Sequence, residues 1–299
     1  MRFVVAALPN DPELAAWLGK KGSVNGITFY NRKDNDLSVV VLTPTDPAEK
    51  FYAVAEAVSL ADVVIISTKR IDALFGEAVL AASLIGKKML ITNENDVGEL
   101  MRGPLAGSFE KTSNGEILEK LRKLEEGLEE AHGVRVEVDK AFQVKGVGTV
   151  LLGIVRRGTV KIHDTLKLGD GKEVFVRSIQ VQDDNREEAG KGARVGLAVK
   201  GIDEKDVEKG EVLSETALRR RKEIEMDIKL SGIAAKTNPD GMRCSLVYGF
   251  SVSGCRIAAG ENGRYIAHLD KPLQLEAGDA VLLLKESQPR IFASGVVKG

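Results

Sequence analysis

The loop after the first predicted strand is where a parallel α/β sheet would hold a nucleotide phosphate. A phosphate-binding loop needs glycines whose backbone N–H groups converge, a Lys for the phosphates and a Ser or Thr for magnesium. Residues 9–12, Pro-Asn-Asp-Pro, supply none of these, and the two prolines supply no N–H. Asp11 and Glu13 add negative charge where a phosphate requires cations. We therefore expect that no triphosphate is held here in the usual way.

Histidines and cysteines are too few and too scattered to predict a metal site or a catalytic set. The histidines are His132, His163 and His268, and Cys244 and Cys255 stand eleven positions apart in strand-like sequence. Metal sites use tighter groupings of ligands, and no Ser-His-Asp or Cys-His set stands out. We predict no metal and no catalytic residues from these patterns, although groupings in space stay open.

One run of four consecutive cations is a candidate for binding a polyanion. Arg219, Arg220, Arg221 and Lys222 follow one another between two regions of strand-like sequence. The run is either a phosphate-binding strip or an ordinary solvated linker. Four phosphate contacts would make the binding constant fall with salt, with a log–log slope of about −3 to −4.

The composition is that of a folded protein with two or three domains: 299 residues, 43% hydrophobic and 29% charged. No apolar run reaches membrane-spanning length and the N-terminus lacks a signal-peptide pattern, so we expect no membrane association. Two cysteines cannot form a disulfide framework, which favours the cytoplasm. The net charge is −5 over residues 1–133, zero over 134–217 and +4 over 218–299. A polyanion would therefore favour the C-terminal part.

The first third of the chain alternates between strand and helix patterns. Extended segments are predicted at residues 2–9, 27–30, 37–42, 62–68 and 88–92, and helices from 11 to 18, 47–60, 71–85 and 113–132. Pro47 is expected at the first helical position of the second helix, after Asp46. This order predicts a parallel sheet with right-handed crossovers, the first part of an α/β plus all-β fold.

The pattern changes to short strands of period two after residue 133. The predicted strands are 134–138, 141–144, 149–155, 159–162, 165–168, 174–179, 194–199 and 211–214. Glycines recur at 146, 148, 153 and 158, with β-branched and apolar residues between them. Strands bent at Gly and closed into a small barrel give this pattern.

The same residues resemble the second domain of the translation GTPases, above all the EF-Tu and SelB type elongation factors. The resemblance rests on segments 142–158, 160–166, 176–180, 193–202 and 209–213, in the family's order. Segments 278–284 and 289–297 resemble the family's third, β-barrel domain more loosely. The resemblance implies a GTPase-like α/β domain at 1–133 and β-barrels at 134–217 and 218–299.

Compared with the family's GTPase domain, the N-terminal third departs at every group that touches phosphate or metal. The phosphate loop is replaced by residues 7–12, and the magnesium-holding Asp-x-x-Gly by residues 42–45, Leu-Thr-Pro-Thr. Thr28 is a counterpart of the switch threonine, and Asn93 and Asp96 keep two positions of the guanine-reading motif around Glu94 and Asn95. No counterpart of the last base-binding motif stands near Gly107 and Ser108. The resemblance thus implies a vestigial nucleotide site, no GTP hydrolysis and no cofactor.

In this family the β-barrel of the second domain holds the acceptor end of aminoacyl-tRNA, with the amino acid between the first two domains. The resemblance therefore implies RNA-binding candidates, which read single-stranded RNA by stacking, 2′-OH contacts and charge. They are Phe142, Arg156, Arg157, Gln180 and Arg194, with Gly148 and Gly153 allowing close backbone approach. The structural alternatives are a barrel-core aromatic for Phe142, a solvated strand end for the arginine pair and tight curvature for the glycines.

The favoured hypothesis is a paralogue of these factors that binds tRNA or another translation component without GTP hydrolysis. No membrane or DNA is expected as a partner. Two alternatives stay open: a GTP-binding factor with unusual phosphate contacts, in which GTP and magnesium would be cofactors, and a protein–protein regulatory module. Without a γ-phosphate switch, the orientation of the domains should be fixed.

Overall fold

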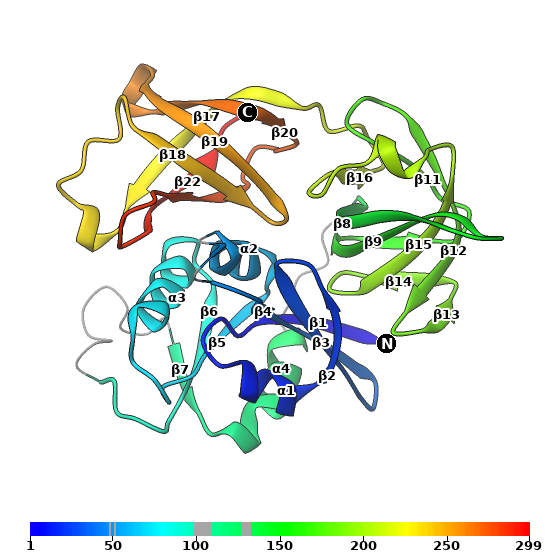
Figure 1. The fold of residues 1–299 in the computed structure, drawn as a ribbon, viewed down its shortest axis with the longest axis horizontal. Coiled ribbons are helices and arrows are strands. Elements are labelled where there is room, and N and C mark those ends of the chain that lie inside the picture. The colour runs from blue at the N-terminus through cyan, green and yellow to red at the C-terminus, as the bar shows by residue number, and fades with distance from the viewer. Residues whose placement is uncertain (48, 51, 99–108, 127–132) are drawn as a thin grey trace.

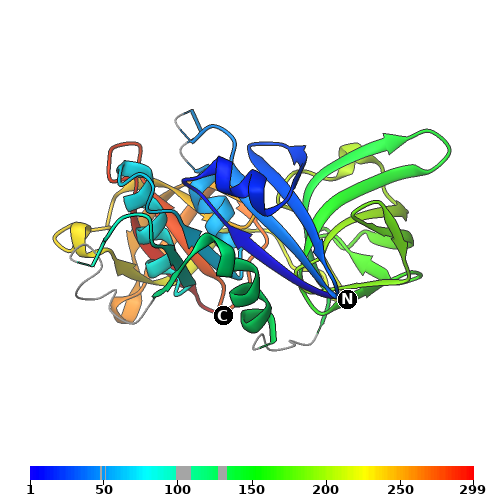
Figure 2. The same cartoon turned by 90° about the horizontal axis from the view of Figure 1, so that it is seen from below.

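The computed structural model describes residues 1–47, 49–50, 52–98, 109–126 and 133–299. An α/β domain comes first, and two β-barrels lie against it from two sides (Figure 1) (Figure 2). The predicted fold class, an N-terminal parallel-sheet domain followed by β-barrels, is therefore confirmed.

The N-terminal domain is built on a sheet with the order β2-β3-β4-β1-β5-β6-β7. The strands that pair in parallel are β1 (Arg2–Ala7), β4 (Leu37–Pro44), β5 (Val63–Ile66), β6 (Lys88–Thr92) and β7 (Phe109–Thr112). At one edge β3 (Ile27–Asp34) and β2 (Lys20–Val24) continue the sheet as antiparallel strands. The sequence pattern did not predict β2 or β7, whose residues are mostly exposed and carry no alternation of apolar side chains.

Helices cover both faces of this sheet. One face carries α1 (Pro12–Leu18) and α4 (Ile117–Glu126), which follows the short η1 (Asn114–Glu116). The opposite face carries α2 (Ala53–Leu60) and α3 (Ala73–Leu84). No helix within the described residues is long and apolar enough to span a membrane. Of the predicted helix at 113–132, residues 127–132 lie outside the described residues.

The prediction that the second helix begins at Pro47 is wrong, because α2 begins at Ala53. The Asp46-Pro47 signal instead makes a turn, in which Lys50 N donates to Asp46 O at 2.9 Å and Glu49 N to Asp46 Oδ1 at 3.3 Å. Asx turns and helix N-caps use the same side-chain acceptor, so this dipeptide does not distinguish them. The resulting α2 is short, and each of its residues is buried.

The first of the two barrels along the chain follows the α/β domain, and we call it the second barrel. It has the strand order β11-β16-β8-β9-β15-β12-β13, and β11 pairs with both β16 and β12, so the sheet closes on itself. Its strands are β8 (Arg135–Val144), β9 (Gly148–Arg157), β11 (Thr165–Lys167), β12 (Glu173–Val181), β13 (Asp184–Arg186), β15 (Arg194–Lys200) and β16 (Val212–Ser214). Two further strands, β10 (Thr159–Lys161) and β14 (Glu188–Gly190), pair with each other as a separate sheet. The strands predicted at 134–138 and 141–144 are one strand, β8, with an irregular register beside Asp139.

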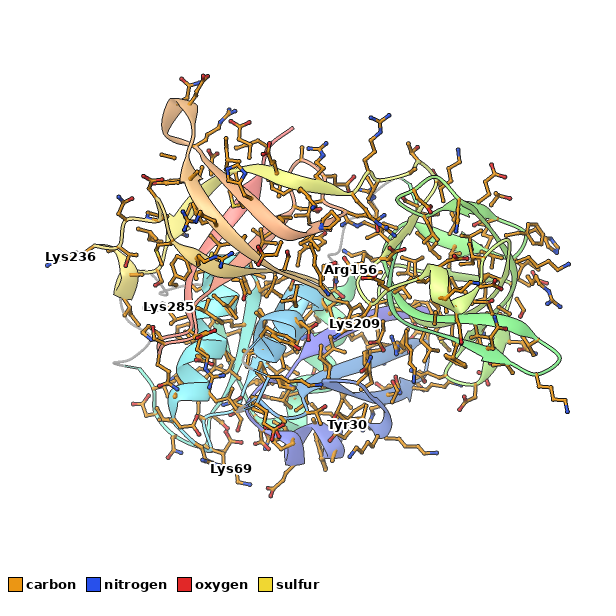
Figure 3. All side chains as sticks on the ribbon, turned by 45° about the horizontal axis from the view of Figure 1, so that its top comes forward. Tyr30, Lys69, Arg156, Lys209, Lys236 and Lys285 are labelled. Carbon is orange, nitrogen blue, oxygen red and sulfur yellow. The ribbon has the colours of Figure 1, made fainter. Side chains whose placement is uncertain are left out.

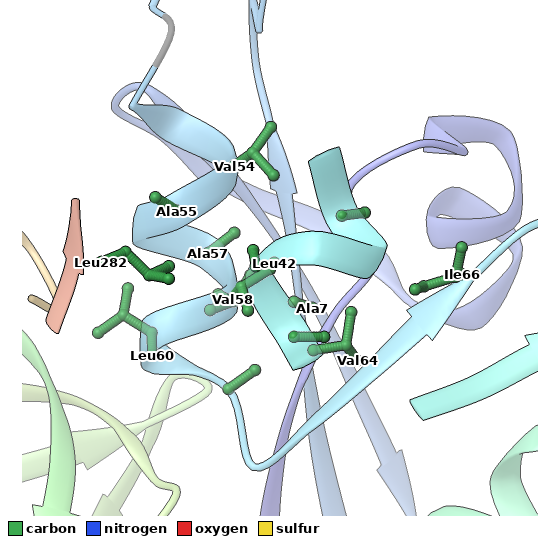
Figure 4. Close-up of a cluster of buried hydrophobic side chains, with 14 of the residues drawn as sticks. Ala7, Leu42, Val54, Ala55, Ala57, Val58, Leu60, Val64, Ile66 and Leu282 are labelled. Atoms are coloured by element: carbon green, nitrogen blue, oxygen red, sulfur yellow. The ribbon is translucent and has the colours of Figure 1, made fainter. Parts of the chain in front are cut away.

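The other barrel, at the C-terminal end of the chain, is called the third barrel. It closes in the order β17-β20-β19-β18-β21-β22. Its strands are β17 (Arg221–Leu230), β18 (Arg243–Tyr248), β19 (Ser251–Ala259), β20 (Tyr265–Leu273), β21 (Ala280–Leu284) and β22 (Ile291–Val297). This barrel packs onto α2 and α3, because Val247, Phe250 and Leu282 belong to the same apolar cluster as those helices. Figure 4 shows Leu282 facing α2 across the domain boundary.

Leu282→Ala should lower the free energy of unfolding by about 2–5 kcal/mol, because the side chain is fully buried and the substitution leaves a cavity between β21 and α2. Urea denaturation followed by circular dichroism measures the loss. Val296→Ala is the matched control in the same barrel, since Val296 is 42% exposed, and should change the value by about 0.5 kcal/mol or less. Equal losses for the two variants would contradict the packing described above.

Candidate functional site

At the edge of the sheet where β1 and β5 end, the polar side chains form hydrogen bonds within the protein. Asp11 accepts a hydrogen bond from Leu14 N at 2.9 Å and another from Ser67 Oγ at 2.8 Å. Asn10 Nδ2 donates to Ser67 O at 2.7 Å, and Asn10 Oδ1 accepts from Ser67 N at 3.0 Å. The main-chain carbonyl of Asp11 also accepts from Ala15 N. The N–H groups of Leu14 and Ala15 in the first turn of α1 are therefore bonded to Asp11, which is itself buried.

The neighbouring loop after β6 is tied to β5 in the same manner. Thr68 Oγ1 donates to Glu94 Oε2 at 3.1 Å and accepts from Asn95 N at 2.9 Å, while Asn95 Nδ2 donates to Thr68 O at 2.7 Å. Lys69 forms an ion pair with Glu13 at 2.5 Å. The polar groups at this edge thus bond to one another.

The three residues predicted for a vestigial nucleotide site do not form one cluster. Asn93 and Asp96 are exposed on the loop after β6, where Asp96 Oδ1 accepts from Gly98 N at 2.9 Å. Thr28 is buried in β3, with its Oγ1 3.0 Å from Thr45 Oγ1. Strands β4, β1 and β5 separate Thr28 from the other two. The segment around Gly107 and Ser108 lies outside the described residues.

A cleft of about 430 Å³ lies between the β2–β3 hairpin and the second barrel. Cations and amides share its lining, which includes Lys20, Lys21, Lys33, Gln180, Gln182 and Arg194. Lys20 and Lys21 are exposed, and Lys33 pairs with Asp184 at 2.6 Å. The structure thus brings the predicted residues Gln180 and Arg194 together. It adds the two lysines of β2, which sequence reasoning missed although they stand side by side before a Gly-Ser pair.

Arg194 forms the base of this cleft and is only 9% exposed. Its guanidinium donates to Asp139 Oδ2 at 2.7 Å and to Ser23 Oγ at 3.3 Å, and its Cζ lies 4.0 Å from the centre of the Phe29 ring. Burial lowers the pKa of the Arg194 guanidinium, and Asp139 opposes that effect. Arg194 therefore joins the second barrel to the N-terminal domain and is charged at the floor of the cleft.

The predicted arginine pair on β9 bonds within the protein. Arg156 donates to the main-chain oxygens of Ser59, at 3.0 Å, and Leu60 at the end of α2. Arg157 pairs with Glu276 of the third barrel at 2.7 Å. Figure 3 shows Arg156 and Lys209 where the three parts of the molecule meet. These contacts assign Arg156 and Arg157 to domain packing.

In the linker between the barrels, Arg220 pairs with Glu211 of the second barrel. Arg219 is exposed beside it, and Arg221 and Lys222 are exposed at the start of β17. We call these three exposed residues the linker cations, and Arg220 holds the chain against the second barrel.

The predicted residues of the β8–β9 hairpin have different surroundings. Phe142 is half-buried on β8, opposite Val150. Gly148 has a φ of +101° near the exposed tip of the hairpin. A Cβ on Gly153 would lie 2.5 Å from Glu137 O, so this glycine allows β8 and β9 to approach closely in the barrel.

Comparison with known proteins fits this architecture. Residues 148–214 match the family model described as elongation factor Tu domain 2. The chain is 30% identical over 292 residues to the uncharacterized protein MJ0325 of Methanocaldococcus jannaschii, covering 94% of each chain. It is 28% identical over 178 residues to the selenocysteine-specific elongation factor of the same organism, covering 57% of this chain and 37% of that protein. The chain belongs to the EF-Tu/SelB-like family of translation factors.

A solved member of this family has the same fold along the whole chain. The structure of the elongation factor SelB from Methanococcus maripaludis with the GTP analogue GppNHp matches with a TM-score of 0.79 and 20% identity, covering all of this chain and 80% of that one. The family membership supports a translation-factor-like role.

The buried carboxylate of Glu56 gives a pH-dependent prediction for this family member. Glu56 on α2 is 1% exposed, and its Oε1 accepts from Lys209 Nζ at 2.7 Å. Burial raises the pKa of Glu56 above its ordinary value of 4.5, and Lys209 opposes the rise. The folded chain then binds more protons than the unfolded chain above pH 4.5, so the contribution of Glu56 to stability falls as pH rises through that window.

The free energy of unfolding of the native chain, relative to that of Glu56→Gln, should therefore fall as pH rises above about 4.5, by at most about 1.4 kcal/mol per pH unit. Denaturant titrations from acid to neutral pH measure this difference. Glu119→Gln, a change in an exposed pair with Lys123 on α4, controls for the lost surface charge. If this difference in the free energy of unfolding instead rises with pH, the pairing with Lys209 lowers the pKa of Glu56 by more than burial raises it.

Proposed function

We propose that this chain is a SelB/EF-Tu-like binding protein that works without GTP hydrolysis and without a cofactor. Its proposed domains are residues 1–133, 134–217 and 218–299. The observation that carries the proposal is the position of Asp11, whose side-chain and main-chain oxygens accept hydrogen bonds from Leu14 N and Ala15 N in the first turn of α1. A phosphate placed there would meet a carboxylate and find those donors taken.

The proposed ligand is tRNA, or another component of the translation machinery, in the cytoplasm. The open cleft between the β2–β3 hairpin and the second barrel supports this choice, because exposed Lys20 and Lys21 share its lining with the amides of Gln180 and Gln182. Lysines can contact phosphates, while Gln180 and Gln182 offer donors and acceptors to base edges or 2′-OH groups. The resemblance to the family also supports an RNA acceptor end as the proposed ligand of this barrel.

The exposed linker cations supply a second surface for the same polyanion. Arg219, Arg221 and Lys222 are exposed to solvent, whereas Arg220 pairs with Glu211. A net charge of +4 over residues 218–299, against −5 over residues 1–133, favours an RNA that extends along the barrels rather than over the α/β domain.

GTP and GDP should show no saturable binding in the micromolar range, with or without magnesium, because the buried carboxylate of Asp11 would repel a phosphate and already accepts from Leu14 N, while Ala15 N is bonded to Asp11 O. Titration with fluorescent nucleotide analogues measures this. A SelB-type factor with an intact phosphate loop serves as the positive control. Micromolar, magnesium-dependent binding would instead support the alternative of a nucleotide-binding factor with unusual phosphate contacts.

Lys20→Ala/Lys21→Ala should weaken binding of an RNA minihelix with a single-stranded 3′ end by about tenfold at low salt, and reduce the log–log salt slope by about 1.4. Fluorescence anisotropy over a series of salt concentrations measures both quantities. The matched control is Lys229→Ala/Lys236→Ala, which removes two exposed lysines of the third barrel; Figure 3 shows Lys236 at its outer tip.

Arg221→Ala/Lys222→Ala tests the linker surface separately in the same assay. Equal weakening by the β2 variant and the control would place the RNA elsewhere. A native chain that binds the minihelix without any salt dependence would exclude the phosphate contacts proposed here. A native chain that binds no RNA but retains ribosomal proteins in a pull-down would favour the protein–protein regulatory module.

A further inference from the structure

The two cysteines of the chain form a pair in the third barrel. Cys244 on β18 lies directly opposite Cys255 on the antiparallel β19, and the two Sγ atoms are 3.4 Å apart. Both thiols are free and buried, Cys244 at 9% exposure and Cys255 at 2%. The sequence does not predict this pairing, because the two cysteines are eleven positions apart and the register of the hairpin decides whether they face each other.

The register satisfies the backbone requirement of a disulfide. Residues directly opposite in an antiparallel pair have Cα atoms about 4.5 or 5.5 Å apart, and disulfides span Cα separations of about 4.4–6.8 Å. Closing the bond therefore requires the sulfur atoms to approach from 3.4 Å to about 2.05 Å, without moving the strands. The barrel thus holds the dithiol in position for oxidation.

A cavity gives a small reagent access to this pair. It has a volume of about 570 Å³, and both cysteines line it together with Arg243, Asp270 and Lys285. Charges of both signs at its mouth suit a small zwitterionic molecule. Among the described residues, no group of three His, Cys, Asp or Glu side chains could hold a metal ion, so a metal site does not account for the pair.

The two thiols are chemically unequal. The hydrogen bond that they share lowers the pKa of Cys244 and, together with burial, raises the pKa of Cys255. Cys244 is also the more exposed of the two. Because the thiolate is the reacting form, Cys244 is the attacking residue and Cys255 the resolving one.

We propose that Cys244 and Cys255 are a redox-active cross-strand dithiol that a low-molecular-weight disulfide oxidises. The Cys244 thiolate attacks one sulfur of the reagent, which forms a mixed disulfide and releases one small thiolate. The Cys255 thiolate then attacks Cys244 Sγ, which forms the Cys244–Cys255 bond and releases the second small thiolate. The dithiol loses two electrons and two protons, and the reagent leaves as two thiols.

The test is a redox titration of the full chain in mixtures of reduced and oxidised glutathione. Intact mass, thiol counting in denaturant and peptide mapping give the products. The native chain should lose both thiols, become lighter by two hydrogens and yield a Cys244–Cys255 cross-linked peptide, with no retained glutathione. Retention of both thiols in fully oxidised glutathione, glutathione on both residues or cross-linked dimers would each overturn the proposal.

Single variants test the assigned roles of the two cysteines. Cys255→Ser should keep one glutathione on Cys244, because no resolving thiol remains. Cys244→Ser should react at least about tenfold more slowly, since Cys255 is more buried and less readily ionised. Equal rates for the two variants would overturn the assignment of Cys244 as the attacking residue. Circular dichroism checks that each variant is folded, and the result for the native chain does not depend on them.

Discussion

The arrangement of the whole molecule depends on how the C-terminal end of α2 is satisfied. This helix is buried along its full length, so its last carbonyls have no access to bulk water and need donors from other parts of the chain. Arg156 of the second barrel bonds Ser59 O and Leu60 O, and Lys87 after α3 bonds Ala61 O. From the third barrel, Gly249 N donates to Ser59 Oγ at 2.8 Å. The end of this one short helix thus receives hydrogen bonds from both barrels, and cations suit the negative end of its dipole.

Buried ion pairs reinforce this junction by specifying geometry more than by adding net stability. The pair Lys209–Glu56 joins the second barrel to α2, and the pair Arg290–Glu77 joins the third barrel to α3. Each pair holds a buried carboxylate, whose desolvation offsets most of the Coulomb attraction. Breaking either pair, however, leaves a buried charge without its partner, which costs about 3–5 kcal/mol for such sites. A rotation of either barrel relative to the α/β domain would break one of these pairs together with the bonds to α2. The junction therefore favours one fixed orientation of the domains.

The fold was more predictable from the sequence than the candidate site. Alternating apolar residues and recurrent glycines depend on local geometry, so they indicated the α/β sheet and the barrel strands correctly. Local signals were wrong where one dipeptide is compatible with both a turn and a helix start, as Asp46-Pro47 is before α2. The role of Arg156 is set by Leu60, 96 positions away, and no local pattern tells whether such an arginine faces solvent or another domain. The cleft lysines of β2 lie on an exposed edge strand without alternation, which leaves no periodic signal.

The contrast between the two polar regions of the α/β domain explains why a binding role without a nucleotide switch is physically consistent. At the ends of β1, β5 and β6 the polar side chains bond one another, so a ligand would have to displace bonds that are already made. At the β2–β3 hairpin Lys20 and Lys21 are exposed at an open cleft, whereas Lys33 is already paired with Asp184. Because Ser23 and Asn25 of the hairpin form hydrogen bonds with Arg194 and Asp139 of the barrel, the cleft is preorganised. Its occupancy would then follow the concentration and affinity of the ligand rather than the state of a bound nucleotide.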